Sequence, residues 1–506
     1  MKRIPVIHPF LFAVFPVFYL YAHNIKSIPI SLSELLWPLI GSVAGAIGLW
    51  LVLIKVIKSP ERAGIAVSLI IMWFFSFGRI AEAISEWTSG VFDKSLFFAS
   101  LILLGGVLFL VIRSRRDFPR MTMSLNVIAT TLVALNLGSA GLTLARRTPT
   151  LLLNDVAISA GAASRPNIYY IVLDAYTRGD ILKELFDYDN SAFLAELENM
   201  GFYIASKSYS NYSQTHHSFA SSLNFSYLDR LAKEMGAGSS DRELLYQMIQ
   251  DNRVMAFLKG HGYRIVTVSS GMWPTDIKEA DRYIGFKRSP SEFLHVFLNT
   301  TPLPLFLDLT IGVSEYDAHR ERILHAFDSL ARAPDEKGPF FLFAHIMAPH
   351  PPFVFGPNGE HVRPDYAFSL VDADRMRGES ESAIRDYIRR YRDQLIFINI
   401  KALETIQAVL CRSALPPVII LQGDHGSRAY ADLDRPEASN FRENLAILNA
   451  YHLPGLDQSL LYPAISPVNT FRLLFREYFG AELELLEDKS FWNTWRRPYR
   501  FIPFDE

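Results

Sequence analysis

The segment Pro417-Val-Ile-Ile-Leu-Gln-Gly-Asp-His-Gly426 is a short apolar, β-rich run that ends in a carboxylate and an imidazole. Runs of this length and composition are typical of strands that are buried in a parallel sheet. Asp424 and His425 offer an oxygen and a nitrogen ligand side by side, and Gly426 permits close approach. Because ligands of open α/β sheets bind beyond the carboxyl ends of the strands, this segment predicts both a buried strand and a site at its end.

Two other apolar runs end in the same way. Asn167-Ile-Tyr-Tyr-Ile-Val-Leu173 leads into Asp174, and Pro339-Phe-Phe-Leu-Phe-Ala344 leads into His345 and then into His350. Carboxylates and imidazoles at one edge of one sheet are the ligands of a divalent-metal site. Simpler alternatives are a capping role for Asp174, a turn role for the Asp-His pair, and packing of His350 in its proline-rich turn.

Apolar runs alternate with amphipathic segments through the last two thirds of the chain. The predicted strands are residues 168–173, 263–268, 340–344, 418–421 and 445–449. The predicted helices are residues 190–200, 241–259, 318–331 and 382–408. This alternation predicts an α/β fold with a mainly parallel sheet between helices.

A hydroxyl-rich segment, residues 211–224, supplies a candidate nucleophile. If a helix starts near His216, Thr215 lies at its N-terminus, where backbone N–H groups and the helix dipole favour an anion. The same environment helps to deprotonate a metal-bound hydroxyl, so Thr215 is the predicted nucleophile. Ser213 and Ser218 are rival candidates, and a plain N-cap role for Thr215 is the simpler alternative.

The N-terminal region contains five long apolar runs, near residues 9–22, 35–53, 64–77, 96–112 and 123–144. Each is near or below the roughly 20 residues that span a bilayer core. Nine Lys or Arg residues in the loops on one side oppose five on the other, which predicts that the richer side is cytoplasmic. We expect residues 1–147 to form a transmembrane helical domain, 148–165 a linker, and 166–506 an extracytoplasmic domain that carries the site. The alternative is that some of these runs are buried helices of a soluble domain.

Composition excludes several classes of protein. The 50 Lys and Arg residues nearly balance the 52 Asp and Glu residues, which disfavours nucleic-acid binding. The single cysteine, Cys411, permits neither an internal disulfide nor a four-cysteine zinc cluster, and we expect it to be a small buried apolar residue.

The order of Asp174, Thr215, His350 and Asp424-His425 resembles the alkaline phosphatase and sulfatase superfamily. Five spans followed by an outward domain are similar to its membrane-bound phosphotransferase branch, which includes lipoteichoic acid synthases and phosphoethanolamine transferases. The resemblance implies a sulfatase-like catalytic domain after the transmembrane bundle.

Site roles follow from this resemblance. It implies that Asp174, Asp424 and His425 bind one divalent metal, while Thr215 completes the shell and attacks phosphorus. A mixed shell of Asp and His suits Zn or Mn better than Mg, which prefers oxygen ligands.

Three further residues are expected to contact the substrate. His350 would contact the phosphate or protonate the leaving oxygen. Arg428 would supply a charge-assisted contact to phosphate, although an arginine is more often on the surface. His345 is expected either to contact the substrate or to serve as a structural residue behind it.

The resemblance has two departures that bear on the reaction. Sulfatases carry a Cys-x-Pro-Ser-Arg pattern whose cysteine is oxidised, whereas this chain has Thr215-His-His-Ser-Phe219, which argues against sulfate-ester hydrolysis by that route. Membrane-bound relatives often have Glu where Asp174 stands, so the shorter side chain changes the metal geometry.

These features together predict an enzyme of the cytoplasmic (inner) membrane, multi-pass, with a periplasmic catalytic domain. We expect a metal-dependent transferase that moves a phospho-headgroup from a membrane lipid donor to an envelope lipid or glycan acceptor. Two alternatives stay open: a phosphodiesterase or sulfatase-like hydrolase with the same site, and a catalytically silent protein that binds an envelope lipid or glycan.

Overall fold

The computed structural model describes residues 5–25, 32–88, 93–114, 118–145, 165–286, 292–305, 315–336, 338–364, 368, 370 and 380–505. The chain forms two compact units. The bundle unit comprises residues 1–149 and 288–314, and the sheet unit comprises residues 150–287 and 315–506. The predicted linker, residues 148–165, lies outside the described residues except for its last one.

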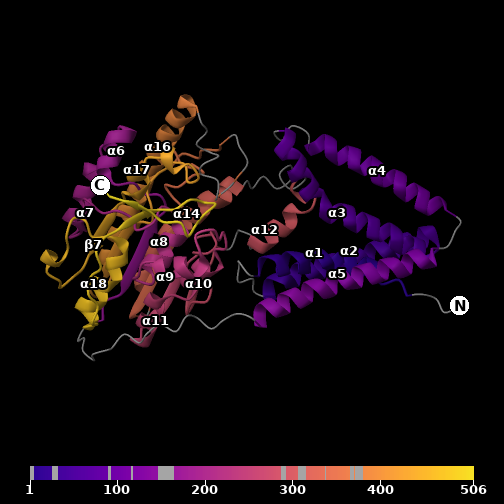
Figure 1. The fold of residues 1–506 in the computed structure, drawn as a ribbon, viewed down its shortest axis with the longest axis horizontal. Helices are drawn as coiled ribbons and strands as arrows, with labels where there is room; N and C mark the ends of the chain where they lie inside the picture. Colours follow the sequence, from indigo (N-terminus) through magenta and orange to yellow (C-terminus); the bar gives the residue numbers. More distant parts are fainter. Residues whose placement is uncertain are drawn as a thin grey trace. The chain divides into compact units, whose positions relative to one another are not determined.

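Five apolar helices make up most of the bundle unit (Figure 1). They are α1 (His8–Asn24), α2 (Leu32–Ile57), α3 (Pro60–Thr88), α4 (Asp93–Arg113) and α5 (Pro119–Ala145). The last four are long and apolar enough to cross a membrane, and α1 is slightly shorter at 17 residues. The five predicted apolar helices are therefore confirmed. Helix α3 continues well beyond the predicted apolar run and takes in Arg79 and Glu82.

One short helix from later in the chain also belongs to the bundle unit. This helix is α12 (Glu292–Asn299), and it packs against α1 and α2.

The sheet unit is built on seven strands in the order β2-β7-β6-β1-β5-β3-β4. Their bounds are β1 (Ile168–Leu173), β2 (Tyr203–Ile204), β3 (Arg264–Val268), β4 (Arg282–Ile284), β5 (Phe340–Ile346), β6 (Val418–Gly423) and β7 (Asn449–His452). All neighbouring pairs are parallel except β2 with β7 and β6 with β7. The predicted α/β class with a mainly parallel sheet is confirmed. A separate hairpin pairs β8 (Ser490–Trp492) with β9 (Ile502–Phe504).

Helices cover both faces of this sheet. One face packs against α6 (Gly179–Phe186), α7 (Ser191–Asn199), α14 (Glu315–Arg332) and α16 (Glu381–Arg412). The other packs against α8 (Thr215–Ser222), α9 (Asp229–Met235), α10 (Glu243–Gln250), α11 (Arg253–Gly260) and α18 (Pro467–Phe479). Strand β1 alternates between the two cores, with Tyr169 and Ile171 in one and Tyr170 and Val172 in the other. Burial on both faces explains why the strand has no charged position.

Some predicted boundaries are wrong. Residues 445–449 were expected to form a strand, but Phe441–Leu445 is helix α17 and β7 begins only at Asn449. The run between them is buried and makes single antiparallel bridges instead of a ladder. The predicted helix 241–259 is two helices, because Asn252 caps α11 by accepting a hydrogen bond from the Met255 N–H (2.9 Å).

Helix α16 differs from what its composition suggests in its location and in the exposure of its cysteine. The helix is long and apolar enough over part of its length to qualify as a span, yet it packs in the core of the sheet unit through residues such as Tyr391 and Ile398. Cys411, expected to be buried, is exposed near its C-terminal end.

Candidate active site and metal centre

Asp174 is held where β1 leaves the sheet. Its backbone N–H donates to the Ile346 carbonyl (2.9 Å), and its own carbonyl accepts from the His350 N–H (3.0 Å). Ala175 follows with φ +60°, a left-handed conformation that is uncommon for a residue with a Cβ. The Tyr391 hydroxyl donates to the Ala175 carbonyl (2.7 Å) and so holds this turn. The Asp174 side chain is fully buried as a result.

Asp424 and His425 lie beside it because β6 pairs with β1. The register aligns Leu173 with Gly423, so the residues that follow the two strands are neighbours. The Ala175 N–H donates to Asp424 Oδ1 (3.0 Å) and ties the two strand ends together. Two glycines make the turn possible: a Cβ at Gly423 would lie 2.6 Å from the Tyr176 carbonyl oxygen, and one at Gly426 would overlap the Glu443 carbonyl oxygen.

The ring of His425 is fixed in the tautomer that a metal ligand needs. Its Nδ1 lies 2.8 Å from the Gly426 carbonyl oxygen, which can only accept a hydrogen bond. Nδ1 therefore carries the proton, and Nε2 presents a lone pair. Nε2 lies 3.7 Å from Asp174 Oδ1 and 3.6 Å from Asp424 Oδ2. Burial lowers the pKa of His425, which keeps the ring neutral.

A divalent cation fits this group of atoms. Ligand atoms of Asp174, Asp424 and His425 all lie within 4.8 Å of one another. Among the described residues, neither Asp174 oxygen nor Asp424 Oδ2 receives a well-aligned hydrogen bond, although all three atoms are buried. Burial, with the charge of Asp424 adding to it, raises the pKa of Asp174 to about 7. Two buried carboxylates with unsatisfied oxygens are costly unless a cation compensates them.

Thr215 lies next to this cluster, at the first residue of α8. Its Oγ1 is 3.2 Å from His425 Nε2. Gln214 is the N-cap, so Thr215 is not the cap that the simpler alternative assumed. The rival hydroxyls are engaged elsewhere: Ser213 Oγ bonds to Asn493, and Ser218 Oγ accepts from Ser210. The geometry thus favours Thr215 over both serines.

His350 approaches from the loop after β5. Its Nδ1 hydrogen-bonds to the Pro351 carbonyl, so Nδ1 carries the proton and Nε2 is free to accept one. Its ring centroid lies 6.4 Å from that of His425. Burial lowers the pKa of His350, and the nearby charge of Asp174 partly opposes this effect.

His345 contacts Asp174 from behind. Its Nε2 lies 3.2 Å from Asp174 Oδ2, and its Nδ1 lies 2.7 Å from Thr275 Oγ1. Burial lowers the pKa of His345 to about 4, so the ring is neutral, and its Nε2 lies close to the carboxylate without a well-aligned hydrogen bond. Both nitrogens then face protein groups, an arrangement that suits orientation of the carboxylate better than contact with a substrate.

Arg428 is buried, with 7% of its surface exposed, and is not a surface arginine. Its Nη2 donates to the Ser213 carbonyl (3.3 Å) and lies 3.3 Å from His425 Nε2. Its Nε has no hydrogen-bond partner among the described residues. A buried guanidinium with an unused donor beside a candidate metal site is suited to bind an anion.

Sequence reasoning missed His319, on α14. The ring is buried, and neither nitrogen has a hydrogen-bond partner in the described part of the chain. Burial lowers its pKa to about 3, and the charges of Arg322 and His350 add to the effect. The signal was visible in the sequence, because His319 falls on the apolar face of an amphipathic helix between Tyr316 and Ile323.

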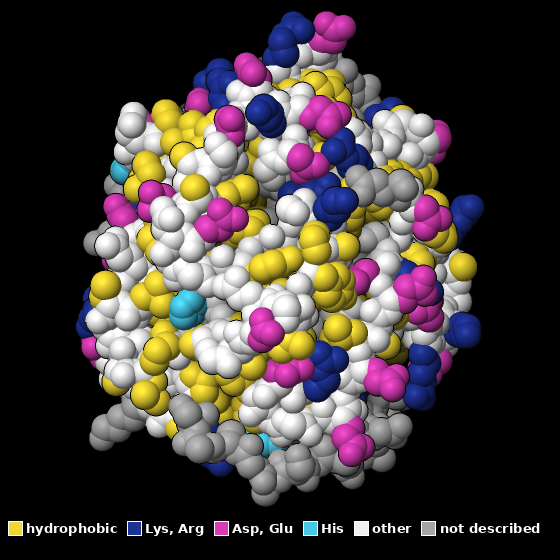
Figure 2. Space-filling view, turned by 90° about the vertical axis from the view of Figure 1, so that its left-hand side faces the viewer, with side chains coloured by type: hydrophobic (Ala, Val, Ile, Leu, Met, Phe, Trp, Pro, Cys, Tyr) yellow, Lys and Arg dark blue, Asp and Glu magenta, His cyan; other side chains and the backbone are white. Residues whose placement is uncertain are grey.

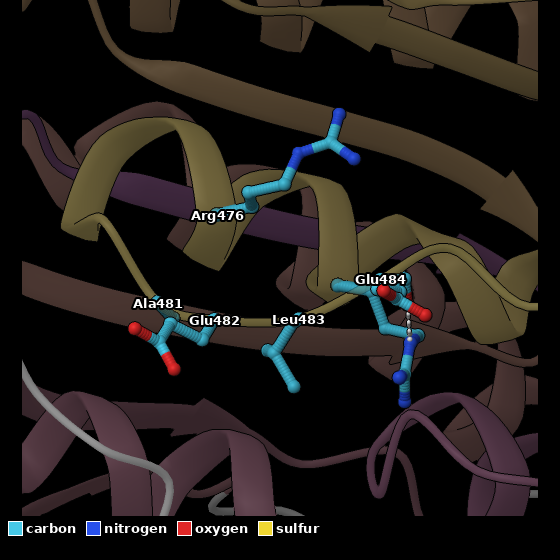
Figure 3. A pocket seen from close by; sticks show the side chains of 6 residues that line it. Arg476, Ala481, Glu482, Leu483 and Glu484 are labelled. Atoms are coloured by element: carbon cyan, nitrogen blue, oxygen red, sulfur yellow. Dashed lines mark hydrogen bonds between the residues drawn. The ribbon is translucent and has the colours of Figure 1, made fainter.

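A surface hollow at the end of α18 is a separate feature (Figure 3). It is lined by Arg472, Arg476, Ala481, Glu482, Leu483 and Glu484. None of the predicted site residues lines it, and Arg472 Nε is already bonded to the Glu484 carbonyl (2.6 Å). This hollow adds nothing to the site at the strand ends.

Comparison with known proteins gives one family match. The family model described as Sulfatase matches residues 166–464. No curated protein gives a significant match to the chain.

Three of the solved structures to which the chain is similar are as follows. The C-terminal periplasmic domain of EcEptC from Escherichia coli, in complex with Zn, is 11% identical with a TM-score of 0.45, over 68% of this chain and 93% of that one. The corresponding domain of the phosphoethanolamine transferase EptC from Campylobacter jejuni is 11% identical with a TM-score of 0.39, over 64% and 92%. The phosphonate monoester hydrolase of Agrobacterium radiobacter is 14% identical with a TM-score of 0.41, over 65% and 80%.

Proposed function

Because the chain belongs to the sulfatase family, whose model covers more than half of its length, we propose that it is a membrane-anchored, metal-dependent phosphotransferase with Thr215 as its nucleophile. At the level of the family it is an enzyme of phospho-group or ester chemistry. The proposal adds the nucleophile, the metal and the choice of transfer over hydrolysis.

One observation carries the proposal: a hydroxyl at a helix N-terminus lies against a buried Asp-Asp-His cluster. Thr215 Oγ1 is 3.2 Å from the His425 nitrogen that bears the lone pair. Backbone N–H groups at the start of α8 favour negative charge on that oxygen. A module that only binds a lipid or glycan has no need of a nucleophile in this position.

Asp174, Asp424 and His425 would hold one Zn or Mn ion, which supplies a Lewis acid that lowers the pKa of a bound hydroxyl and offsets charge on phosphoryl oxygens. Thr215 Oγ attacks the phosphorus of the lipid donor, and the bond from phosphorus to the lipid oxygen breaks. His350 Nε2 takes up the proton of the Thr215 hydroxyl and returns it to the leaving oxygen.

The second half of the cycle restores the enzyme. A hydroxyl of the acceptor attacks phospho-Thr215, the bond to Thr215 Oγ breaks, and the acceptor's proton passes through His350 to Thr215. Arg428 stabilises the anionic oxygens in both halves through its unused Nε donor. Water in place of the acceptor would make the same site a phosphodiesterase.

Sulfate-ester hydrolysis is the less favoured reaction. The position of the nucleophile is a threonine, and Cys411 is exposed on α16, outside the cluster. The apolar helices α1–α5 support a membrane lipid as donor and an envelope lipid or glycan as acceptor, and the loop charges support an extracytoplasmic catalytic domain.

The test measures turnover of a p-nitrophenyl phosphodiester and of p-nitrophenyl sulfate by the full chain in detergent. We expect phosphodiester turnover that stops on chelation and returns with Zn or Mn, with no sulfate turnover. Asp424→Asn should lose both bound metal and turnover. A metal-free, inert wild type would instead support the binding module, and sulfate turnover would support a sulfatase.

A further inference from the structure

The C-terminal hairpin lies outside the family match and next to the segment that carries the proposed nucleophile. The family model ends at residue 464, whereas β8 begins at Ser490. The Phe491 N–H donates to the Asn211 carbonyl (2.9 Å), and Phe491 forms a parallel bridge with Tyr212. The hairpin therefore runs alongside the residues that lead into α8 and Thr215, and membership of the family does not explain this contact.

Asn493, directly after β8, holds the two residues that precede Thr215. The asparagine is completely buried. Its N–H donates to Ser213 Oγ (3.0 Å), and the Ser213 hydroxyl donates to Asn493 Oδ1 (3.0 Å). The side-chain amide of Gln214 donates to the Asn493 carbonyl (2.9 Å). Because Gln214 is the N-cap of α8, these bonds fix the chain at the point where the helix begins.

The other amide atom of Asn493 reaches the first turn of α8. Asn493 Nδ2 lies 3.1 Å from His217 Nδ1. His217 Nε2 lies 2.9 Å from the Pro498 carbonyl oxygen, which can only accept a hydrogen bond. Nε2 therefore carries the proton of the ring, and Nδ1 accepts from the asparagine amide. Asn493 thus contacts residues on both sides of Thr215.

The same network reaches Arg428. The Ser213 carbonyl accepts a hydrogen bond from Arg428 Nη2 (3.3 Å), while the Ser213 hydroxyl is bonded to Asn493. Ser213 thus connects the asparagine with the guanidinium that is proposed to bind the phosphoryl oxygens. Under the proposed function, the nucleophile and this cation are both placed by contacts that begin at Asn493.

The hairpin is anchored on its other side to residues 431–441. The Trp492 ring stacks on the Phe441 ring, with centroids 4.3 Å apart and an interplanar angle of 5°. Trp492 is completely buried in a cluster with apolar residues of this segment. The Arg496 N–H donates to Asp434 Oδ1 (2.9 Å). The hairpin therefore joins this segment, which follows the proposed metal ligands, to the start of α8.

The Thr215 hydroxyl depends on the backbone of α8 for its position. Its Oγ1 lies 3.2 Å from His425 Nε2, and it has no other hydrogen-bond partner among the described residues. An attacking hydroxyl must be closely aligned with its target, and misplacement by about 1 Å costs about 100-fold in rate. The contacts that fix the start of α8 are therefore the ones that set the line of attack.

We propose that Asn493 is a positioning residue for the nucleophile, because it fixes the start of α8 and so keeps the Thr215 hydroxyl in line for attack. We call its hydrogen bonds with Ser213, Gln214 and His217 the asparagine clamp. The inference rests on the proposed function for the role of Thr215, whereas the clamp itself does not. Since Asn493 acts through the start of the helix, its loss should slow the chemical step and leave metal binding unchanged.

The clamp is tested by hydrogen exchange of the full chain in detergent. Asn493→Ala should raise the amide exchange rate of the peptide that covers residues 211–218 at least about tenfold, because the start of α8 loses its partners. Asn252→Ala is the matched control: this asparagine is also buried and bonded through both amide atoms, but it caps α11. The control should leave that peptide unchanged. Unchanged exchange in Asn493→Ala, or an equal rise in both variants, would overturn the clamp.

The role of the clamp is tested with a soluble substrate, ethyl p-nitrophenyl phosphodiester. Asn493→Ala should lower kcat about 100-fold, while KM stays within about threefold and bound metal is retained. Asn252→Ala should keep kcat within about twofold. A purely structural role would lower the unfolding temperature of both variants and leave the kcat of the folded, metal-loaded protein unchanged. A kcat within about twofold of the wild type in Asn493→Ala would overturn the positioning role.

A second variant acts on the partner of the clamp and covers the case in which Asn493→Ala does not fold. Ser213→Ala removes one hydroxyl and should lower kcat about tenfold with metal retained. In the double variant, Ser213→Ala should add less than about twofold to the loss from Asn493→Ala, because both changes break the same contact. Wild-type kcat in Ser213→Ala, or losses that multiply in the double variant, would overturn the positioning role.

Two further outcomes separate this inference from the proposed function. A loss in Ser213→Ala as large as that in Thr215→Ala would make Ser213 the nucleophile and overturn both. If the wild type turns over no phosphodiester, the proposed function fails and the role of Asn493 fails with it. The exchange measurement still decides whether the clamp holds the start of α8.

Discussion

The bundle unit exposes large aliphatic side chains, whereas the sheet unit buries charged ones. On α4 of the bundle, Ile102 and Leu103 are 76% and 72% exposed. In the sheet unit, Asp174 and Asp424 are almost completely buried with unsatisfied oxygens. On the face of the sheet unit that Figure 2 shows, charged side chains of both signs are interspersed with apolar and neutral ones.

Neither pattern is stable for a protein alone in water. A continuous exposed aliphatic surface requires lipid or another apolar partner, and a buried pair of carboxylates requires a cation or protons. Each unit therefore needs a non-protein partner, and under the proposed function these partners are lipid around the helices and a metal with an anionic substrate at the strand ends.

The largest effect is expected at the nucleophile. Thr215→Ala should lower phosphodiester turnover by at least about 10³-fold with bound metal retained, because the attacking oxygen is lost while the Asp-Asp-His cluster stays. Thr215→Ser, which keeps a hydroxyl, should recover part of the rate. Metal content by elemental analysis and initial rates are the measurements, and a Thr215→Ala protein with wild-type rates would remove Thr215 from the reaction.

The exposed aliphatic surface gives the next largest effect. Ile102→Lys places a charge on α4 where lipid is expected, at a cost of about 3 kcal/mol, or about 100-fold in an insertion equilibrium. Leu415→Lys, at a position that is 54% exposed on the sheet unit, should cost nothing, because water surrounds it. A membrane-insertion assay measures both. Equal tolerance of the two changes would show that the bundle does not face lipid.

A smaller loss, of metal affinity, is expected from a change at His345, which contacts the proposed ligand Asp174. His345→Gln should weaken metal binding about 10–100-fold, because the ring that orients Asp174 is replaced while the ligands remain. His261→Gln, on a half-buried histidine at the end of α11 that bonds to the Phe257 carbonyl, is the control. Competition titration with a chromogenic chelator gives both affinities, and unchanged metal affinity in His345→Gln would assign the ring to another role.

The smallest effect is a pH dependence of metal binding. Since the pKa of Asp174 is raised to about 7, protons compete with the metal below that pH, and affinity should fall about fivefold from pH 7 to pH 6. The same shift means that the metal-free protein loses stability as the pH rises through about 7, since burial opposes the charged carboxylate. Titrations at pH 6, 7 and 8 test this, and a flat profile would contradict it.

The strands and residues nearest the chemistry were predictable because their signals are local. β1, β5 and β6 are apolar on both faces, and Asp174, His345 and Asp424 lie at or directly after their ends, so composition and position along the chain were enough. The fold class and the five apolar helices followed from similar patterns.

Features that depend on contacts between segments far apart in the sequence could not be predicted from local sequence patterns. The apolar run before β7 had the composition of a strand but no neighbour to pair with over its full length. The charge of His350 affects the pKa of His319 only because tertiary structure brings α14 near the loop after β5. The membership of α12 in the bundle unit depends on packing against α1 and α2, more than 200 positions earlier in the chain.

The most direct test of a covalent phosphotransferase is to look for the intermediate on Thr215. The wild type is mixed with a long-chain alkyl p-nitrophenyl phosphodiester in phosphatidylglycerol vesicles, quenched in acid within the first turnover, and digested for mass spectrometry. We predict an alkyl-phosphate adduct on the peptide that contains Thr215, absent from the Thr215→Ala protein. Rapid turnover with no adduct on this peptide, at a rate that Thr215→Ala retains, would contradict the account.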